Sequence, residues 1–235
     1  MEWTNSKYLT LPVTRNEQLF PVTLAVSSLP LHALLQDSAR FLHPEEHTTL
    51  TGDALHHYLS GRLAAKLAAS HFTHTAPASI QVRAGVFGQP LLHCPGYSNV
   101  QLSIAHSGGS SMAVVFPEGH PMAVDIEDSR NARLLPPLTP SEDALVATQP
   151  HGPLLLWTAR EALSKVLKTG LTTDLEILGV ASAAVSDSFL IFTFAHFMQY
   201  KAISWVAGEM VCSLVLPLRS EVDLPVLKTI TYPVS

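Results

Sequence analysis

Two carboxylates lie two residues apart in an apolar stretch near the middle of the chain, where residues 123–127 read AVDIE. Alternate side chains of an extended strand share a face, so Asp125 and Glu127 project together while Val124 and Ile126 point the other way. Neighbouring carboxylates repel one another, and Mg²⁺ binds through a few carboxylates together with substrate phosphates. An exposed strand face with both carboxylates in water has the same spacing, so this motif alone leaves both interpretations open.

A third carboxylate and a lysine follow in a helical run, WTAREALSK at residues 157–165. Glu161 and Lys165 are four residues apart and project from a face other than the apolar stripe of the helix. An ordinary surface ion pair with this spacing contributes roughly 0.2–0.5 kcal/mol. The chemical alternative makes Glu161 a metal ligand and Lys165 a phosphate contact.

A histidine beside small residues, His106 in AHSGG, suits an anion site. A turn of small residues lets backbone N–H groups approach an anion, and the imidazole adds a donor. A hydrogen-bonded structural histidine is the simpler alternative. Ser107 is not expected to be a hydrolase nucleophile, because the segment supplies no base and lacks the nucleophile-elbow pattern.

Two cations, Arg62 and Lys66, lie four residues apart on a predicted long helix at residues 52–72. Leucines at every fourth position form the core stripe of this helix. Because the two cations are also four residues apart, their side chains project from the helix together. They form either a solvated basic edge or a phosphate clamp.

The order of predicted elements indicates an α+β fold. Pro44 is expected to begin a short helix, and Thr139 with Pro140 is expected to cap the start of another. Gly170 is expected to end the helix that carries Glu161 and Lys165. Alternating apolar residues predict strands at residues 22–26, 80–87, 101–105, 110–116 and 122–127, and an antiparallel meander of four strands at residues 175–216. Each half offers a helix followed by strands, so we expect two similar halves with a boundary near Pro117 and a cleft between them.

Composition excludes several classes of protein. The 235 residues are 47% hydrophobic and 14% charged, which is enough for a large core. A net charge of −5 and a pI near 6.1 give no footprint for nucleic acid. Cys94 and Cys212 fit no metal or disulfide framework, and no signal peptide or membrane span is apparent. We therefore expect a soluble cytoplasmic protein. We also expect it to be a monomer.

Three motifs occur in a specific order: LSIAHSGG, then AVDIE, then WTAREALSK followed by TGL. This order resembles the Sfp-type 4'-phosphopantetheinyl transferases, whose pattern is S-x-S-H-S, G-(I/V)-D-(I/V)-E and W-(S/T)-x-K-E-(A/S)-x-x-K followed by a glycine. The resemblance extends upstream to GRLAAK and GQP and so covers roughly residues 45–180.

The resemblance implies a fold of two α+β halves related by a pseudo-twofold axis, with the active site between them. Residues 1–117 would form the cofactor side, and residues 118–235 would carry the metal ligands and the catalytic helix. By position in the motifs, the resemblance assigns Mg²⁺ to Asp125, Glu127 and Glu161, catalysis to Glu161 and Lys165, and coenzyme A contacts to Arg62, Lys66, His106 and Lys165.

The implied reaction moves 4'-phosphopantetheine from coenzyme A to a serine of an apo acyl or peptidyl carrier protein, as in fatty acid, polyketide or nonribosomal peptide synthesis. Four positions depart from the family pattern. Ala105 and Gln89 replace a serine and a lysine expected at the cofactor, Ala123 replaces a glycine, and Arg160 replaces a lysine. Two alternatives follow: a non-catalytic member that binds coenzyme A or a carrier protein, and a plain α+β interaction domain.

Overall fold

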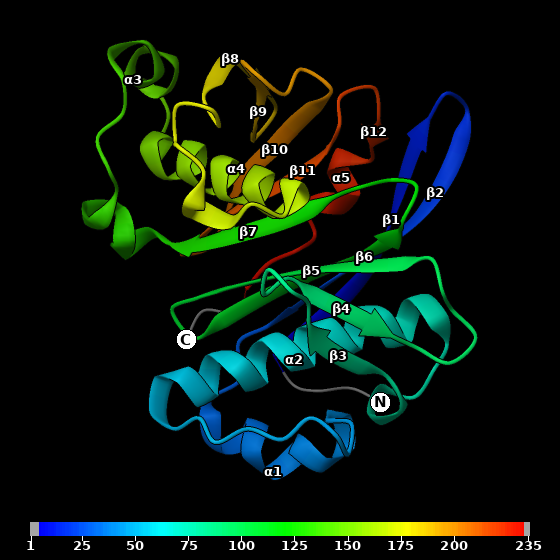
Figure 1. Ribbon diagram of the computed structural model, residues 1–235. Coiled ribbons are helices and arrows are strands. Elements are labelled where there is room, and N and C mark those ends of the chain that lie inside the picture. Colours follow the sequence, from blue (N-terminus) through cyan, green and yellow to red (C-terminus); the bar gives the residue numbers. More distant parts are fainter. Residues whose placement is uncertain (1–4, 233–235) are drawn as a thin grey trace.

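The computed structural model describes residues 5–232, the side chains at 134 and 171 excepted. Within these residues the protein contains five α-helices and three antiparallel sheets (Figure 1), which confirms the predicted α+β class in general terms. None of the described helices is both long and apolar enough to cross a membrane. The ends of the two expected halves, residues 1–4 and 233–235, lie outside the described residues.

The first large sheet has the strand order β12-β1-β2-β6-β5 and carries the long helix on one face. Its elements are β1 (Ser6–Arg15), β2 (Gln18–Ser27), α1 (Leu31–Phe41), α2 (Gly52–Thr73), β5 (Val100–Ser107), β6 (Ser110–Pro117) and β12 (Glu221–Val222). Leucines of α2 pack on Ala25, Ala113 and Val115 of the sheet. The predicted helix at residues 52–72 is confirmed with only its last residue shifted.

The second large sheet has the order β7-β11-β10-β9-β8 and is covered by α4. Its elements are β7 (Ala123–Asp128), α3 (Pro140–Val146), α4 (Gly152–Leu167), β8 (Val180–Ser186), β9 (Phe189–Phe194), β10 (Tyr200–Ala207) and β11 (Met210–Pro217). Strands β8 to β11 form the predicted antiparallel meander. The capping box that begins α3 is also confirmed, with Thr139 and Glu142 bonded reciprocally.

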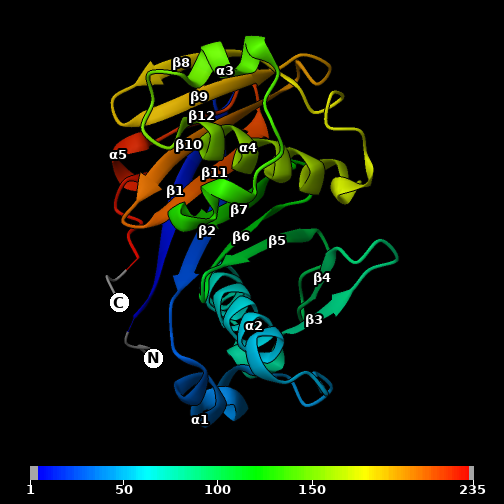
Figure 2. The same cartoon turned by 90° about the vertical axis from the view of Figure 1, so that its left-hand side faces the viewer.

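A small hairpin of β3 (Gln81–Ala84) and β4 (Pro90–His93) projects beside α2 and β5 (Figure 2). The predicted strand at residues 80–87 is therefore too long, because the backbone turns at Gly85. Val86 and Phe87 form the tip and are 93% and 78% exposed, the most exposed of the large hydrophobic side chains in the described chain.

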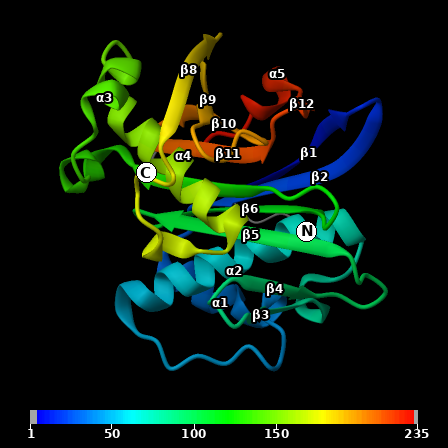
Figure 3. The same ribbon diagram turned by 45° about the horizontal axis from the view of Figure 1, so that its top comes forward.

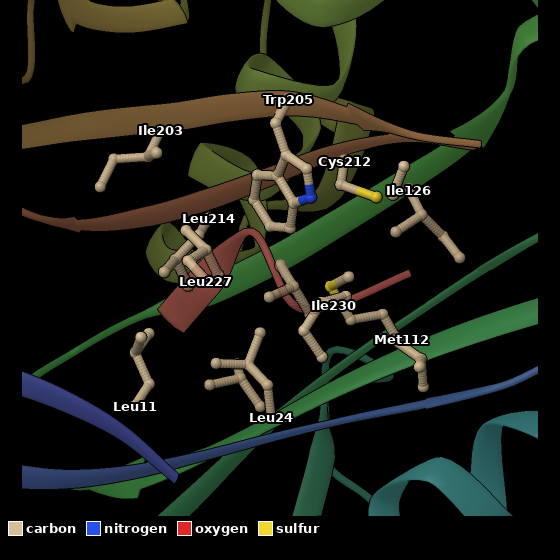
Figure 4. Close-up of a cluster of buried hydrophobic side chains, with 14 of the residues drawn as sticks. Leu11, Leu24, Met112, Ile126, Ile203, Trp205, Cys212, Leu214, Leu227 and Ile230 are labelled. Carbon is tan, nitrogen blue, oxygen red and sulfur yellow. The ribbon is translucent and has the colours of Figure 1, made fainter. Parts of the chain in front are cut away.

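The two large sheets face one another across a shared apolar core, which makes the molecule a four-layer α-β-β-α arrangement (Figures 1 and 2). Leu24 and Met112 from the first sheet meet Ile126, Trp205 and Leu214 from the second (Figure 4). Strands such as β11 are buried on both faces, one against α4 and the other in this core. Burial on both faces explains why β11 reads as a continuous apolar run instead of alternating.

Four local predictions are wrong. Residues 44–51 contain no helix, and α2 begins only at Gly52. The meander is predicted to begin at residue 175, but its first strand, β8, begins at Val180 because the residues before it form turns. Helix α4 ends at Leu167, and its C-cap is Lys168, which adopts a left-handed conformation with φ of 58° two residues before Gly170. His106 belongs to β5 and not to the turn, which is made by Gly108 and Gly109 with φ of 54° and 80°.

Candidate active site

Strands β5 and β7 lie side by side although they belong to different sheets (both labelled in Figure 1; Figure 3 shows the same region from above). Helix α4 packs over β7 from the other side, so the motif residues of all three elements meet at this junction. Lys165 of α4 makes the central contact: its Nζ lies 2.6 Å from Asp125 Oδ1 and donates to the carbonyl oxygen of Val124 at 3.3 Å. Two residues 40 positions apart in the sequence therefore form one ion pair.

The carboxylates at this junction are crowded and largely buried. Burial raises the pKa of Glu161 to about 8, and the negative charge of Asp125 adds to the rise. Burial also raises the pKa of Asp125, although the ammonium of Lys165 opposes that change. Glu127 contributes further negative charge to both groups. Such a cluster gains stability when it binds a proton or a cation.

The donor set at the junction suits magnesium. Asp125 Oδ2 is buried and receives no hydrogen bond from an N–H or hydroxyl group of a described residue. The neighbouring Glu161 carboxyl can bond to Asp125 when one of the two groups carries a proton. Three carboxylates supply the hard oxygen ligands that Mg²⁺ prefers. Within residues 5–232, however, no group of three His, Cys, Asp or Glu side chains is arranged to hold a metal ion as it stands. In this conformation Lys165 supplies the positive charge beside Asp125.

Glu127 has its own fixed partners. Its Oε2 accepts hydrogen bonds from Ser107 Oγ at 2.7 Å and from Asn131 Nδ2 at 3.0 Å. Ser107 comes from β5 and Asn131 from the short 3₁₀ helix η2 (Ser129–Leu134) that follows β7. The orientation of Glu127 is therefore set by β5 of the first sheet and by η2, which follows β7.

His106 lies on β5 next to the carboxylates and faces solvent. Its ring stacks on His57 of α2, with centroids 4.7 Å apart and planes inclined by 18°. Loss of hydration among neighbouring groups lowers the pKa of His106, and the positive charges of His57 and Lys165 lower it further. A neutral imidazole in this position can still donate one hydrogen bond to an anion.

A pocket of about 240 Å³ opens beside His106, between α2 and the β3–β4 hairpin. Its two arginines each have a glutamate partner, Arg62 Nε at 3.6 Å from Glu46 and Arg83 at 2.9 Å from Glu45. Arg62 and Arg83 line it together with His57 and Gly88. The Arg62 guanidinium lies 4.8 Å from the centroid of the Tyr58 ring, which orients the side chain. Several donors thus face one small pocket, as anion binding requires.

A second cavity of about 310 Å³ lies on the other side of the hairpin, between β5 and the end of α4. It is mainly apolar, with Phe87, Phe116 and Met122 among its lining, and it is bordered by Lys165 and Lys168. Lys165 therefore contacts both this cavity and the carboxylate cluster. Its apolar lining and the two lysines at its border suit an apolar chain that ends in an anionic group.

Lys66 is a correction to the expected set of cofactor contacts. Its side chain is fully buried, its Nζ lies 2.7 Å from Glu46 Oε2, and it donates to the carbonyl oxygen of Ile80. An ammonium enclosed in this way cannot reach a ligand. The i, i+4 spacing does bring Arg62 and Lys66 together, but at Glu46, which residues 44–51 place over the helix: Arg62 Nε lies 3.6 Å from Glu46 Oε1.

Three of the four departures from the family pattern have structural explanations. Ala105 is buried in the core between the sheets, so a hydroxyl at this position would face the core and not the pocket beside His106. Gln89 folds back on its own turn, where its Oε1 accepts from the Phe87 N–H at 2.9 Å. Arg160 is buried and paired with Glu142 of α3, which joins the two helices.

Sequence reasoning missed four residues that the structure brings to the junction: His57, Arg83, Ser107 and Asn131. Ser107 carried a signal, because it lies inside the S-x-S-H-S pattern. His57 and Arg83 carried none, since their proximity to His106 depends on how α2 and the hairpin pack against β5.

No family model matches the chain, and a search of curated proteins also found no match. The function must therefore be argued from the motifs and from the geometry of the junction.

Proposed function

We propose that this protein transfers 4'-phosphopantetheine from coenzyme A to a serine of an apo acyl or peptidyl carrier protein. The observation that supports it best is the meeting of Asp125, Glu161 and Lys165, from two elements, beside an arginine-lined pocket and an apolar cavity. Coenzyme A joins a pyrophosphate to a pantetheine arm. It therefore needs three environments: a charged centre, an anion pocket and an apolar channel.

The two sheets support the finer fold proposal. Each large sheet carries one long helix on its outer face, α2 on the first and α4 on the second, and their inner faces share the core. We infer two related α+β halves with the active site at their junction. The terminal strand β12 pairs with β1, so the C-terminal part of the chain also contributes to the first sheet.

In the reaction, the serine hydroxyl oxygen of the carrier attacks the β-phosphorus of coenzyme A. A new P–O bond forms, the bond to the leaving phosphate breaks, and 3',5'-ADP departs with the electron pair. Glu161 accepts the serine proton, directly or through a water that it orients, because it lies at the junction beside Asp125 and Lys165. Lys165 donates to the phosphate oxygens as negative charge develops there.

Mg²⁺ held by Asp125, Glu127 and Glu161 would neutralise charge on the pyrophosphate. Arg62 and His106 bind and orient the phosphates of the cofactor from the pocket between α2 and the hairpin. The apolar cavity shields the pantetheine arm from water and directs it toward Lys165.

The test is direct modification of carriers. The protein is incubated with coenzyme A, Mg²⁺ and a panel of apo acyl and peptidyl carriers, which are then weighed by mass spectrometry. A gain of one phosphopantetheine on any carrier supports the proposal. If a known transferase modifies the panel and this protein modifies none of it, the transferase proposal is wrong.

Gln89 favours one second candidate, a member that binds coenzyme A without turnover. The side chain at this position is used within the turn, so the pocket lacks the cation that the family pattern places there. Titration calorimetry separates the two candidates. Magnesium-dependent binding of coenzyme A without any carrier modification supports the binding protein.

A further inference from the structure

Two serines of β5 connect the two sheets at the junction. Ser103 Oγ accepts from the Val124 N–H at 3.3 Å, and Ser107 Oγ accepts from the Asp128 N–H at 3.1 Å. Both serines are buried. They are four residues apart in β5 and therefore lie on the same face of the strand. In the described chain β5 and β7 are not paired through a backbone hydrogen-bond ladder, and these two serine hydroxyls link the strands instead.

Only one of these serines also contacts a carboxylate. Ser107 has a single hydroxyl proton, and its contacts with the Asp128 N–H and with Asn131 Nδ2 at 3.2 Å are both made to donors. Its proton must therefore be donated to Glu127 Oε2, at 2.7 Å. Asn131 donates to the same oxygen.

The position of Asn131 is itself fixed by the end of β7. Asp128 caps η2, its Oδ1 accepting from the Arg130 N–H at 2.9 Å, and this turns the chain back toward Glu127. The two donors thus approach Glu127 Oε2 from opposite elements. One oxygen of Glu127 is saturated by protein donors, and the other is the one left to bind a ligand.

We propose that Ser107 and Asn131 are positioning residues that hold Glu127 as a one-oxygen ligand for a divalent cation. This inference rests on the proposed function, because it assumes that the carboxylate cluster binds Mg²⁺. Hydrogen-bonded partners of this kind orient metal ligands, and their loss typically weakens metal affinity about 10–100-fold.

The experiment measures Mn²⁺ binding to the full chain by electron paramagnetic resonance, with and without coenzyme A. Ser107→Ala is expected to weaken Mn²⁺ binding about 10–100-fold. Ser103→Ala is the matched control, since it removes the same kind of strand contact without touching Glu127, and it should keep the Mn²⁺ affinity of the wild type. Ser107→Thr keeps the hydroxyl and should restore most of the affinity.

The outcomes are distinct. Equal losses in Ser103→Ala and Ser107→Ala, or no loss in either, overturn the inference and leave Ser107 as a connection between strands. If the wild type modifies carriers and binds Mn²⁺ but Ser107→Ala binds it equally well, only this inference fails. If the wild type binds no Mn²⁺ with or without coenzyme A, the metal site of the proposed function fails as well.

Asn131→Ala provides the second variant, which keeps the test decisive if Ser107→Ala does not fold. It removes one of the two donors to Glu127 and leaves both strand contacts in place. A weaker Mn²⁺ affinity at an unchanged melting temperature supports the positioning role. Unchanged affinity in a folded Asn131→Ala protein overturns the role of Asn131.

Discussion

At the scale of single residues, identical chemical types have opposite roles that only burial reveals. Lys165 and Lys66 are both lysines paired with a carboxylate. Lys165 keeps about a third of its side chain exposed and borders two sites, whereas Lys66 is fully enclosed. The first is proposed to act on phosphate, and the second is a core residue that neutralises Glu46.

Lys165→Met should abolish most of the transfer activity per folded molecule. The ammonium stabilises the negative charge that develops on phosphate, and loss of one such donor costs about 10²–10³ in kcat. Steady-state carrier modification measures the effect. Lys228→Met, which makes the same change on an exposed lysine after α5 (Leu224–Leu227), is the control. Equal activity in the two variants would show that Lys165 has no part in the reaction.

Lys66→Met should have the reverse effect, with normal activity per folded molecule and a large loss of stability. Removal of one partner leaves Glu46 buried with its charge poorly compensated, which costs about 3–5 kcal/mol. Urea denaturation measures the free energy of unfolding. Adding Glu46→Gln should recover part of the loss. A stable Lys66→Met protein with weakened coenzyme A binding would contradict the assignment of Lys66 to the core.

At the scale of elements, helix ends and strand ends decide where the site residues meet. Helix α3 begins at a capping box, and its Glu142 continues from the cap to Arg160 of α4 and to the Val180 N–H of β8. The cap therefore connects three elements next to the helix that carries Glu161. Its local pattern was visible in the sequence, but its connection to Arg160 was not.

Thr139→Ala should destabilise the protein by ~1 kcal/mol, because it removes the side-chain acceptor that caps α3. Thr139→Ser keeps the oxygen and should retain most of the stability. The midpoint of urea unfolding reports the difference between the two variants. If alanine and serine are equivalent at this position, the cap contributes nothing measurable.

At the scale of the whole molecule, the connection between the two sheets is anchored by a buried histidine. His120 follows β6 in the turn that leads to β7, and its Nε2 lies 2.7 Å from Ser220 Oγ beyond β11. Its ring also packs on Phe20 of the β1–β2 hairpin, with centroids 4.5 Å apart. Segments from both sheets thus meet at one titratable group.

Stability is expected to fall at acid pH partly through His120. Burial lowers the pKa of His120, and the charge of Arg15 lowers it further, so the folded protein favours the neutral ring. The unfolded chain then binds more protons as the pH falls below about 6.5. The stability that the neutral His120 ring contributes is complete above that pH, and it is lost as the pH falls toward the pKa of His120 in the folded state.

His120→Gln tests this dependence, because glutamine cannot gain the proton. Urea unfolding of both proteins is measured from pH 8 down toward the pKa of His120 in the folded state. The free energy of unfolding should fall less steeply with pH in the variant. Comparison with the wild type removes the contributions of other groups whose pKa is also lowered, such as His71 and His106. Parallel curves for the two proteins would exclude His120 as a source of the pH dependence.

The sequence by itself determined the features that depend on neighbouring residues. Periodicity placed α2 and α4, the capping box placed α3, and alternation put Asp125 and Glu127 on one face of β7. Three ordered motifs also selected most of the residues now found at the junction. These signals are local, because the helical and strand repeats act over a few residues.

Only the tertiary structure decided which of those residues meet. The pairing of Lys165 with Asp125, the stacking of His57 on His106, and the burial of Lys66 all join segments far apart in the chain. Such contacts depend on how two sheets and their helices pack, and a charged residue on a helix carries no mark of whether a distant loop will cover it. For the same reason Ser107 was visible as part of a motif, while its hydrogen bond to Glu127 appeared only once β5 lay beside β7.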